Sequence, residues 1–282
     1  MTERRQILLH AGFHKTGTSS MQHFLWANRE RLAPEADVLL LRHLQPVAKL
    51  CMGYARQRNP LLLADLAPAL DTVLAEHPPG AGRHLVLSCE GLSGHLPGWP
   101  GVADYSAAPE TIGFIAGWLA ARFPHAELSV VLTTRDAEGW LYSAYRHHLL
   151  GQRLTLDWSD FATRMQGAAD LIAAAVAIAE AVAETAPAAQ VLTLPLEDAI
   201  RHPLGPGGAL IEGLALSAPL RASLRAVGHG NRGPDKALWS QFLALNRRAM
   251  PDSALAKAKR DLAEAAGLGG WRPVKPHRKG TP

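Results

Sequence analysis

Lys15 stands in a short segment that has the composition of an anion-binding loop. Residues 12–20 read Gly-Phe-His-Lys-Thr-Gly-Thr-Ser-Ser and directly follow a short apolar run. Glycines allow a tight turn in which successive backbone N–H groups converge, and a helix that starts there adds partial positive charge. Lys15 supplies a full charge, and the hydroxyl groups of Thr16, Thr18 and Ser19 can donate hydrogen bonds. The segment therefore predicts a site for a phosphate or a similar anion.

The position of the lysine argues against an ordinary ATP or GTP site. In the Walker A pattern G-x-x-x-x-G-K-[ST], the lysine follows the second glycine directly. Here Lys15 comes two residues before Gly17. The alternative interpretation is a capped strand-to-helix turn with a solvated lysine. One lysine, three hydroxyls and two glycines in one turn favour the anion site.

A second set of anion-binding side chains follows a later apolar run. Arg135 comes directly after the segment 128–134, and Ser143 lies eight residues further along, inside the next expected helix. An arginine at the carboxyl end of a strand and a serine on the following helix can converge on one anion, to which arginine offers a planar fork of donors. Asp136 is expected to cap that helix. The alternatives are an ion pair between Arg135 and a nearby acid, and an ordinary helix hydroxyl for Ser143.

These two motifs carry a resemblance to a known family. The string His-Lys-Thr-Gly-Thr-Ser resembles the 5′-phosphosulfate loop of the sulfotransferase superfamily, particularly its bacterial branch, which uses 3′-phosphoadenosine-5′-phosphosulfate (PAPS) as co-substrate. By this resemblance Lys15 contacts the oxygen that bridges phosphate and sulfur. The residues implied to hold the 5′-phosphate are His14, Thr16, Gly17, Thr18 and Ser19. The spacing of Arg135 and Ser143 is similar to the family's 3′-phosphate motif, and no metal is expected.

The resemblance also implies a general base after the strand expected at 84–88. Animal cytosolic members use a histidine at about this point, and several carbohydrate-modifying members use a glutamate. This chain has Glu90 there, with His95 five residues further on. Open α/β sheets keep their sites at the carboxyl edge of the strands. Glu90 is therefore the first choice for the base, and His95 and His14 are its rivals.

Two further segments are weaker candidates for contacts with the donor. Animal members end in an Arg-Lys-Gly stretch that binds the 3′-phosphate, and this chain carries Arg278, Lys279 and Gly280 near its end. The glycine and tryptophan that follow in that pattern are absent here. Asn231, in a Gly-Asn-Arg-Gly segment, is another candidate for a cofactor contact.

The apolar segments that position these residues alternate between short runs and longer amphipathic stretches, which is typical of an α/β protein with a parallel sheet. We expect a P-loop-NTPase-like central parallel sheet flanked by helices, in a single sulfotransferase domain of residues 1–282 with a basic tail at 271–282. The expected strands are 6–11, 38–41, 84–88, 128–134 and 190–194. The expected helices are 19–31, 61–75, 109–122, 137–150, 168–184, 236–248 and 254–266.

The composition is that of a globular protein with a sizeable core, at 48% hydrophobic and 19% charged residues among 282. The net charge of +4 is spread with mixed sign, which does not favour a nucleic-acid partner. Two cysteines, Cys51 and Cys89, favour a reducing, cytoplasmic compartment over a disulfide framework. No apolar stretch is long enough for a membrane span.

The expected reaction is in-line transfer of a sulfuryl group to a hydroxyl or amine of a small-molecule, carbohydrate or lipid acceptor, with little covalent work by the protein. The sequence identifies neither the acceptor nor the oligomeric state. One alternative is a P-loop kinase that uses ATP and magnesium, which the position of Lys15 opposes. Another is a catalytically inactive nucleotide-binding module.

Overall fold

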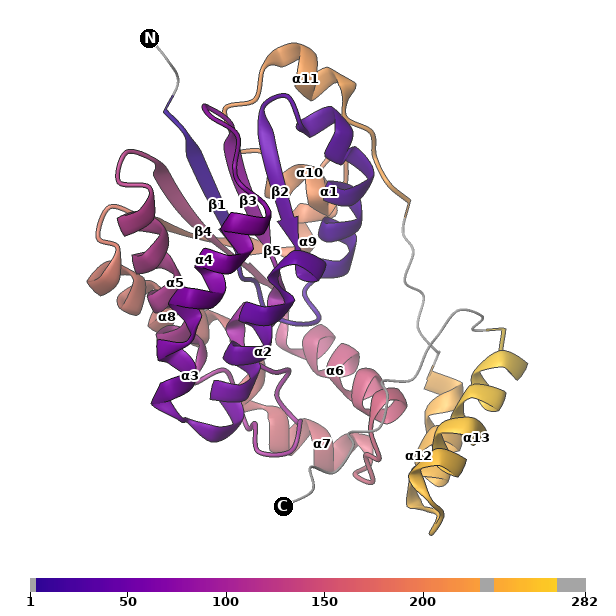
Figure 1. The fold of residues 1–282 in the computed structure, drawn as a ribbon. Coiled ribbons are helices and arrows are strands. Elements are labelled where there is room, and N and C mark those ends of the chain that lie inside the picture. Colours follow the sequence, from indigo (N-terminus) through magenta and orange to yellow (C-terminus); the bar gives the residue numbers. More distant parts are fainter. Residues whose placement is uncertain (1–3, 229–235, 268–282) are drawn as a thin grey trace.

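The computed structural model describes residues 4–228 and 236–267, and a five-stranded parallel sheet lies at its centre (Figure 1). The strand order is β2-β3-β1-β4-β5, and every neighbouring pair is parallel. The strands are β1 (Gln6–His10), β2 (Ala36–Leu40), β3 (His84–Ser88), β4 (Glu127–Thr134) and β5 (Gln190–Pro195). Helices flank this sheet, so the α/β fold class expected from the sequence is confirmed.

Helices cover both faces of the sheet because alternate strand residues point to opposite sides. Ile7 and Leu9 of β1 belong to one buried cluster, whereas Leu8 between them belongs to the other. The first cluster includes side chains of α2 (Leu41–Gln57), α4 (Leu66–Glu76), α5 (Ala108–Arg122) and α8 (Leu171–Thr185). The second includes those of α1 (Thr18–Leu32), α9 (Leu196–Ala199), α10 (Pro206–Leu210) and α11 (Ala218–Ser223).

Three of the expected helices differ in detail from those observed. The helix expected at 168–184 starts at Leu171 as α8, after a 3₁₀ turn at Gly167–Ala169. The helix expected at 61–75 is divided into α3 (Pro60–Ala64) and α4. Pro68 explains the break, because it lacks the N–H that would bond to the carbonyl of Ala64 and its ring crowds that carbonyl. The helix expected at 236–248 begins with a 3₁₀ turn, η3 (Lys236–Leu238), before α12 (Trp239–Arg247).

Several helices were not expected from the sequence. The longest is α2, and α7 (Trp158–Met165) and the short helices α10 and α11 are others. Two further 3₁₀ turns are η1 (Glu90–Ser93) and η2 (Gly167–Ala169).

Among the described residues, no helix combines the length and the apolar character that crossing a membrane requires.

The helices α12 and α13 (Asp252–Ala265) are fastened to the end of α6 (Ala137–Gly151), beside which they lie in Figure 1. The ammonium group of Lys259, a residue that is 3% exposed, donates to the carbonyl oxygens of Leu149 at 2.7 Å, Leu150 at 3.2 Å and Gln152 at 2.6 Å. The last carbonyls of a helix have no partner within it. Lys259 therefore supplies a C-terminal cap for α6, the helix that carries Ser143.

Candidate functional site

The loop between β1 and α1 has a backbone shape suited to an anion. Lys15 and Gly17 have φ angles of 70° and 89°, both in the left-handed region. For a non-glycine residue such as Lys15 this conformation costs about 1–2 kcal/mol, and such strain concentrates at functional sites. A side chain at position 17 would approach Leu196 Cδ1 to 2.6 Å, so Gly17 is required for space as well as for conformation. Helix α1 starts directly after it, with its N–H groups directed at the loop.

Two threonine hydroxyls stabilise the loop from inside. The buried Thr16 Oγ1 donates to the carbonyl oxygen of Phe13 at 2.5 Å and lies 2.6 Å from Thr133 Oγ1 at the end of β4. Thr18 Oγ1 donates to the same carbonyl at 3.3 Å. These hydroxyls shape the loop, which leaves the backbone N–H groups, the Lys15 side chain and the exposed Ser19 to face a ligand.

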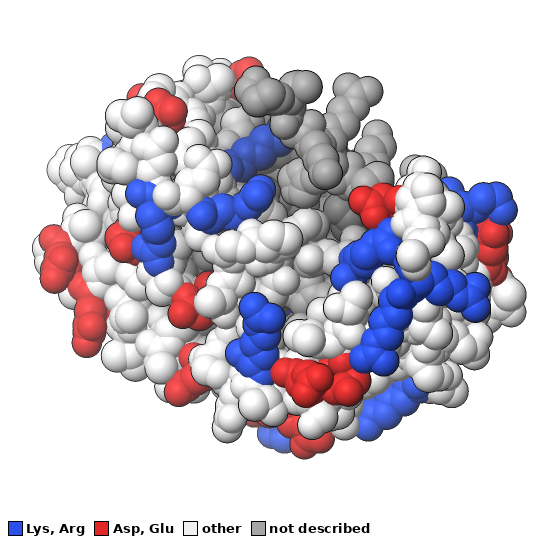
Figure 2. All heavy atoms as spheres, turned by 90° about the horizontal axis from the view of Figure 1, so that it is seen from below, with Lys and Arg blue, Asp and Glu red and all other residues white. Residues whose placement is uncertain are grey.

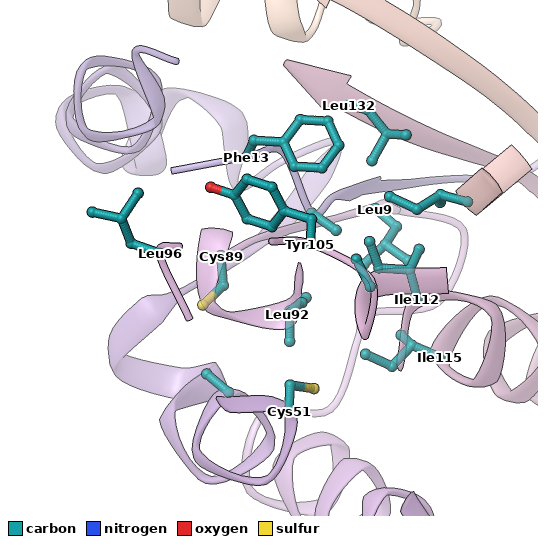
Figure 3. Close-up of a cluster of buried hydrophobic side chains, with 14 of the residues drawn as sticks. Leu9, Phe13, Cys51, Cys89, Leu92, Leu96, Tyr105, Ile112, Ile115 and Leu132 are labelled. Carbon is teal, nitrogen blue, oxygen red and sulfur yellow. The ribbon is translucent and has the colours of Figure 1, made fainter. Parts of the chain in front are cut away.

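The loop is also anchored in the hydrophobic core. Figure 3 shows the ring of Phe13 beside that of Tyr105, and their centroids are 4.7 Å apart. The Tyr105 hydroxyl accepts a hydrogen bond from the backbone N–H of His14 at 3.1 Å. One aromatic residue of the loop and one from outside it thus hold the backbone next to Lys15 in place.

Arg135 and the start of α6 lie against this loop. Arg135 Nη1 is 3.4 Å from the carbonyl oxygen of Lys15, at the long end of hydrogen bonding, and Trp140 Nε1 donates to the carbonyl of His14 at 3.0 Å. Asp136 caps α6 as expected, since its carboxylate accepts from Gly139 N at 2.6 Å. Ser143 lies on the same helix and is 8% exposed.

Lys15 and Arg135 have no acidic partner in the part of the chain that the structure describes. Among the described residues, neither Lys15 nor Arg135 takes part in an ion pair, and the Nε atom of Arg135 is buried without a hydrogen-bond partner. Burial, together with the charges of Arg146 and Arg135, lowers the pKa of Lys15 to about 8, and the charge of Glu90 opposes this shift. Unpaired, partly buried cations are costly unless a ligand supplies the missing negative charge.

Several histidines near Lys15 are held neutral. The pKa is lowered to about 3 for His14, to about 2 for His147 and to about 4 for His148. Burial is the main cause in each case, and the charge of Lys15 contributes. These imidazoles add no charge near pH 7 and donate or accept hydrogen bonds only as neutral groups. A low pKa also makes His14 a weak general base.

Glu90 follows β3, the neighbour of β1, at the same edge of the sheet. Gln22 of α1 donates to Glu90 Oε2 at 2.8 Å, and the Glu90 charge acts on Lys15. The rival His95 is partly buried, with its ring centroid 5.2 Å from that of Trp99.

The structure therefore brings Lys15, Glu90 and the Arg135–Ser143 segment to the carboxyl ends of three adjacent strands, β1, β3 and β4. This is the edge at which open α/β sheets bind ligands. Figure 2 views the molecule from below and shows Lys and Arg side chains on both sides of the middle of this face. The other candidates, Asn231, Arg278, Lys279 and Gly280, lie outside the described residues.

Sequence reasoning missed two residues of the site, Arg146 and His147, both on α6. They lie three and four residues after Ser143, the spacing that puts side chains on one face of a helix. That spacing was the signal that could have found them.

Glu197 and Asp198 lie in the first turn of α9, and Glu197 also contacts the start of α6. Glu197 Oε1 accepts from the backbone N–H of Asp136, the N-cap residue of α6, at 3.3 Å.

In the described part of the chain, no group of three or more His, Cys, Asp or Glu side chains is arranged to hold a metal ion.

Comparison with known proteins yields one distant likeness. No family model and no curated protein matches the chain. A crystal structure of a sulfotransferase from Alicyclobacillus acidocaldarius is similar at a TM-score of 0.41 with 16% sequence identity, over 90% of this chain and 99% of that one. Similarity at this level does not establish a shared family or activity.

Proposed function

We propose that this chain is a sulfotransferase that binds PAPS at the carboxyl edge of the sheet and transfers its sulfuryl group to a small-molecule, carbohydrate or lipid acceptor. One observation carries the proposal. Lys15 and Arg135 are brought together by the contact of Arg135 Nη1 with the Lys15 carbonyl, have no acidic partner among the described residues, and leave Arg135 Nε buried and unpartnered.

The donor chemistry fits this arrangement. PAPS carries two separate anionic groups, the 5′-phosphosulfate and the 3′-phosphate. The loop after β1 offers backbone N–H groups and Lys15 to the first group, and Arg135 with Ser143 offers a guanidinium fork and a hydroxyl to the second. Because β1 and β4 are adjacent strands, both positions lie within the reach of one nucleotide.

In the proposed reaction the protein positions groups and neutralises charge. Lys15 stabilises the negative charge that builds on the bridging oxygen as the bond from sulfur to that oxygen breaks. Glu90 takes the proton of the acceptor hydroxyl or amine as the new bond to sulfur forms, and the leaving product is 3′,5′-adenosine bisphosphate. Among the histidine rivals, His14 is disfavoured as the base by its low pKa.

A reducing, cytoplasmic setting is part of this proposal. Cys51 and Cys89 are both buried and form no disulfide, which suits a compartment that keeps thiols reduced.

The test offers PAPS and a library of hydroxyl and amine acceptors to the purified protein and searches by mass spectrometry for a product heavier by one sulfuryl group. The matched control is Lys15→Ala, which should lower turnover by about 100-fold or more because an electrostatic donor of the transition state is lost. Near-wild-type turnover in Lys15→Ala would refute the assignment of the loop. A phosphorylated product formed from ATP and magnesium would instead identify a kinase, and donor binding with no product from any acceptor would indicate an inactive module.

A further inference from the structure

Arg146 is a third cation of the site, and it lies on the face of α6 that meets the phosphate loop. The contact from Trp140 Nε1 to the His14 carbonyl, at 3.0 Å, holds α6 against the loop. Ser143 follows Trp140 by three residues and Arg146 follows Ser143 by three, so the three side chains are neighbours along one side of the helix.

The Arg146 side chain is half-buried and has no partner within residues 4–228 and 236–267. In the described ranges it makes neither an ion pair nor a side-chain hydrogen bond, and none of its nitrogen atoms is sealed from solvent. Arg153, just past the end of the same helix, is fully engaged: it bonds to the carbonyls of Arg248 and Met250 and to the carboxylate of Asp252. Arg153 thus bonds to two carbonyls and a carboxylate, whereas Arg146 has no acceptor among the described residues.

The charges around Arg146 show which part of the site it faces. Of the charges that act on Lys15, that of Arg146 is the largest, ahead of Glu90 and Arg135. The charge of Arg135 in turn acts on Arg146. The Arg146 guanidinium is therefore close enough to Lys15 and to Arg135 to interact with both charges, and it lies on the same side of α6 as Ser143.

We propose that Arg146 contacts the sulfuryl group of the donor and neutralises charge on its oxygens during transfer. This inference rests on the proposed function and deepens it. The Lys15 side chain is assigned to the bridging oxygen, and Arg135 with Ser143 to the 3′-phosphate. With these assignments, no side chain named so far offers a positive charge to the sulfuryl oxygens of the donor. In the step itself, the bond from sulfur to the bridging oxygen breaks, the bond from sulfur to the acceptor forms, and the acceptor proton passes to Glu90.

The experiment compares two ligands that differ by the sulfuryl group alone. Titration calorimetry measures the dissociation constants of PAPS and of 3′,5′-adenosine bisphosphate for the wild type, Arg146→Gln and Arg146→Lys. The control is Arg164→Gln, which removes the same charge from an exposed position on α7. Arg146→Gln should weaken PAPS by about tenfold or more and change the affinity for the bisphosphate by less than about twofold. Arg146→Lys should recover part of the loss, because it restores the charge but not the fork.

Each other outcome overturns the inference in a recognisable way. Equal weakening of both ligands by Arg146→Gln would place Arg146 on a phosphate, and no change in either affinity would place it away from the donor. Normal bisphosphate binding in Arg146→Gln also shows that the variant is folded. If the wild type binds neither ligand, the proposed function fails together with this inference; if it binds both and the two affinities respond alike, only the role of Arg146 fails.

Discussion

Gln22 Nε2 donates a hydrogen bond to Glu90 Oε2 at 2.8 Å, and the same amide nitrogen lies 3.3 Å from the carbonyl oxygen of Ser88. Gln22 lies on α1, the helix that begins directly after the Lys15 loop, whereas Glu90 follows β3. This bond therefore connects the proposed donor site to the proposed base. Among the described residues no group donates to Glu90 Oε1, which leaves that oxygen available for the acceptor.

Gln22→Ala should leave the base in place but free to rotate. We expect turnover to fall by about tenfold, as for the loss of one hydrogen bond of roughly 1–1.5 kcal/mol, with unchanged affinity for 3′,5′-adenosine bisphosphate. The measurement is steady-state kinetics beside calorimetry, with Gln57→Ala at the exposed end of α2 as the matched control. A loss of bisphosphate affinity in Gln22→Ala would show that Gln22 serves the loop and not Glu90.

The identity of the base is decided by comparing Glu90→Gln with His95→Asn and His14→Asn. Glu90→Gln should lower turnover by about 100-fold or more, because general base catalysis contributes about 10²–10⁴-fold, and should bind the bisphosphate normally. His14→Asn should lose much less, since burial and nearby positive charges lower the pKa of His14 to about 3. If His95→Asn alone shows the signature expected of Glu90→Gln, the base is His95.

Donor binding should weaken as the pH rises through about 8. Burial and two neighbouring arginines lower the pKa of Lys15 to about 8, so the free protein loses this charge above that pH. A bound anion favours the protonated lysine, so binding near pH 8 should take up a proton. Calorimetry of the bisphosphate from pH 7 to 9.5, in buffers of different ionisation enthalpy, measures both effects. Lys15→Arg should flatten the profile, because arginine stays charged; a wild-type profile that is already flat would contradict the assigned pKa.

Lys259 should stabilise the C-terminal helices through its bonds to the end of α6. Lys259→Met removes the donor to the carbonyls of Leu149, Leu150 and Gln152 and should lower the free energy of unfolding by about 1–3 kcal/mol at pH 7. Denaturant unfolding with hydrogen exchange of α12 and α13 measures the change. Lys257→Met is the control, since Lys257 pairs with Asp261 on the exposed side of the same helix. Equal destabilisation by both variants would contradict this role.

The pH dependence of the Lys259 contribution has a defined sign. Burial, with help from the Arg153 charge, lowers the pKa of Lys259 to about 8 from 10.5, although the three carbonyl bonds favour the charged form. Between these pH values the unfolded chain binds more protons at this site than the folded chain does. The contribution of Lys259 to stability therefore rises with pH across that window and decreases as the pH falls through about 8.

The five strands and the shape of the loop between β1 and α1 were predictable because their signals are local. Each strand is a short apolar run, and the loop is a set of glycines, hydroxyls and one lysine between β1 and α1. The Arg135 segment was predictable for the same reason, since a strand, a capping aspartate and a helix follow one another directly.

Helix α2 was missed although its pattern is present in the sequence. Leu44, Val47, Ala48 and Cys51 are buried at helical spacing, but Pro46 interrupts the pattern. A proline inside a helix is unfavourable, and burial of the apolar face overrides that local preference here. The partners of Lys259 could not be predicted, nor could the absence of a partner for Arg146 among the described residues, because both depend on which distant elements pack against α6.

The most direct test of the proposed donor site compares nucleotides with and without the 3′-phosphate. Calorimetry should show that the wild type binds 3′,5′-adenosine bisphosphate about ten to one hundred times more tightly than adenosine 5′-phosphate, because charge-assisted hydrogen bonds contribute roughly 1.5–3 kcal/mol. Arg135→Ala should remove most of that difference and Ser143→Ala part of it. Equal affinity of the wild type for the two nucleotides, equal weakening of both by Arg135→Ala, or a clear preference for ATP with magnesium would contradict the account.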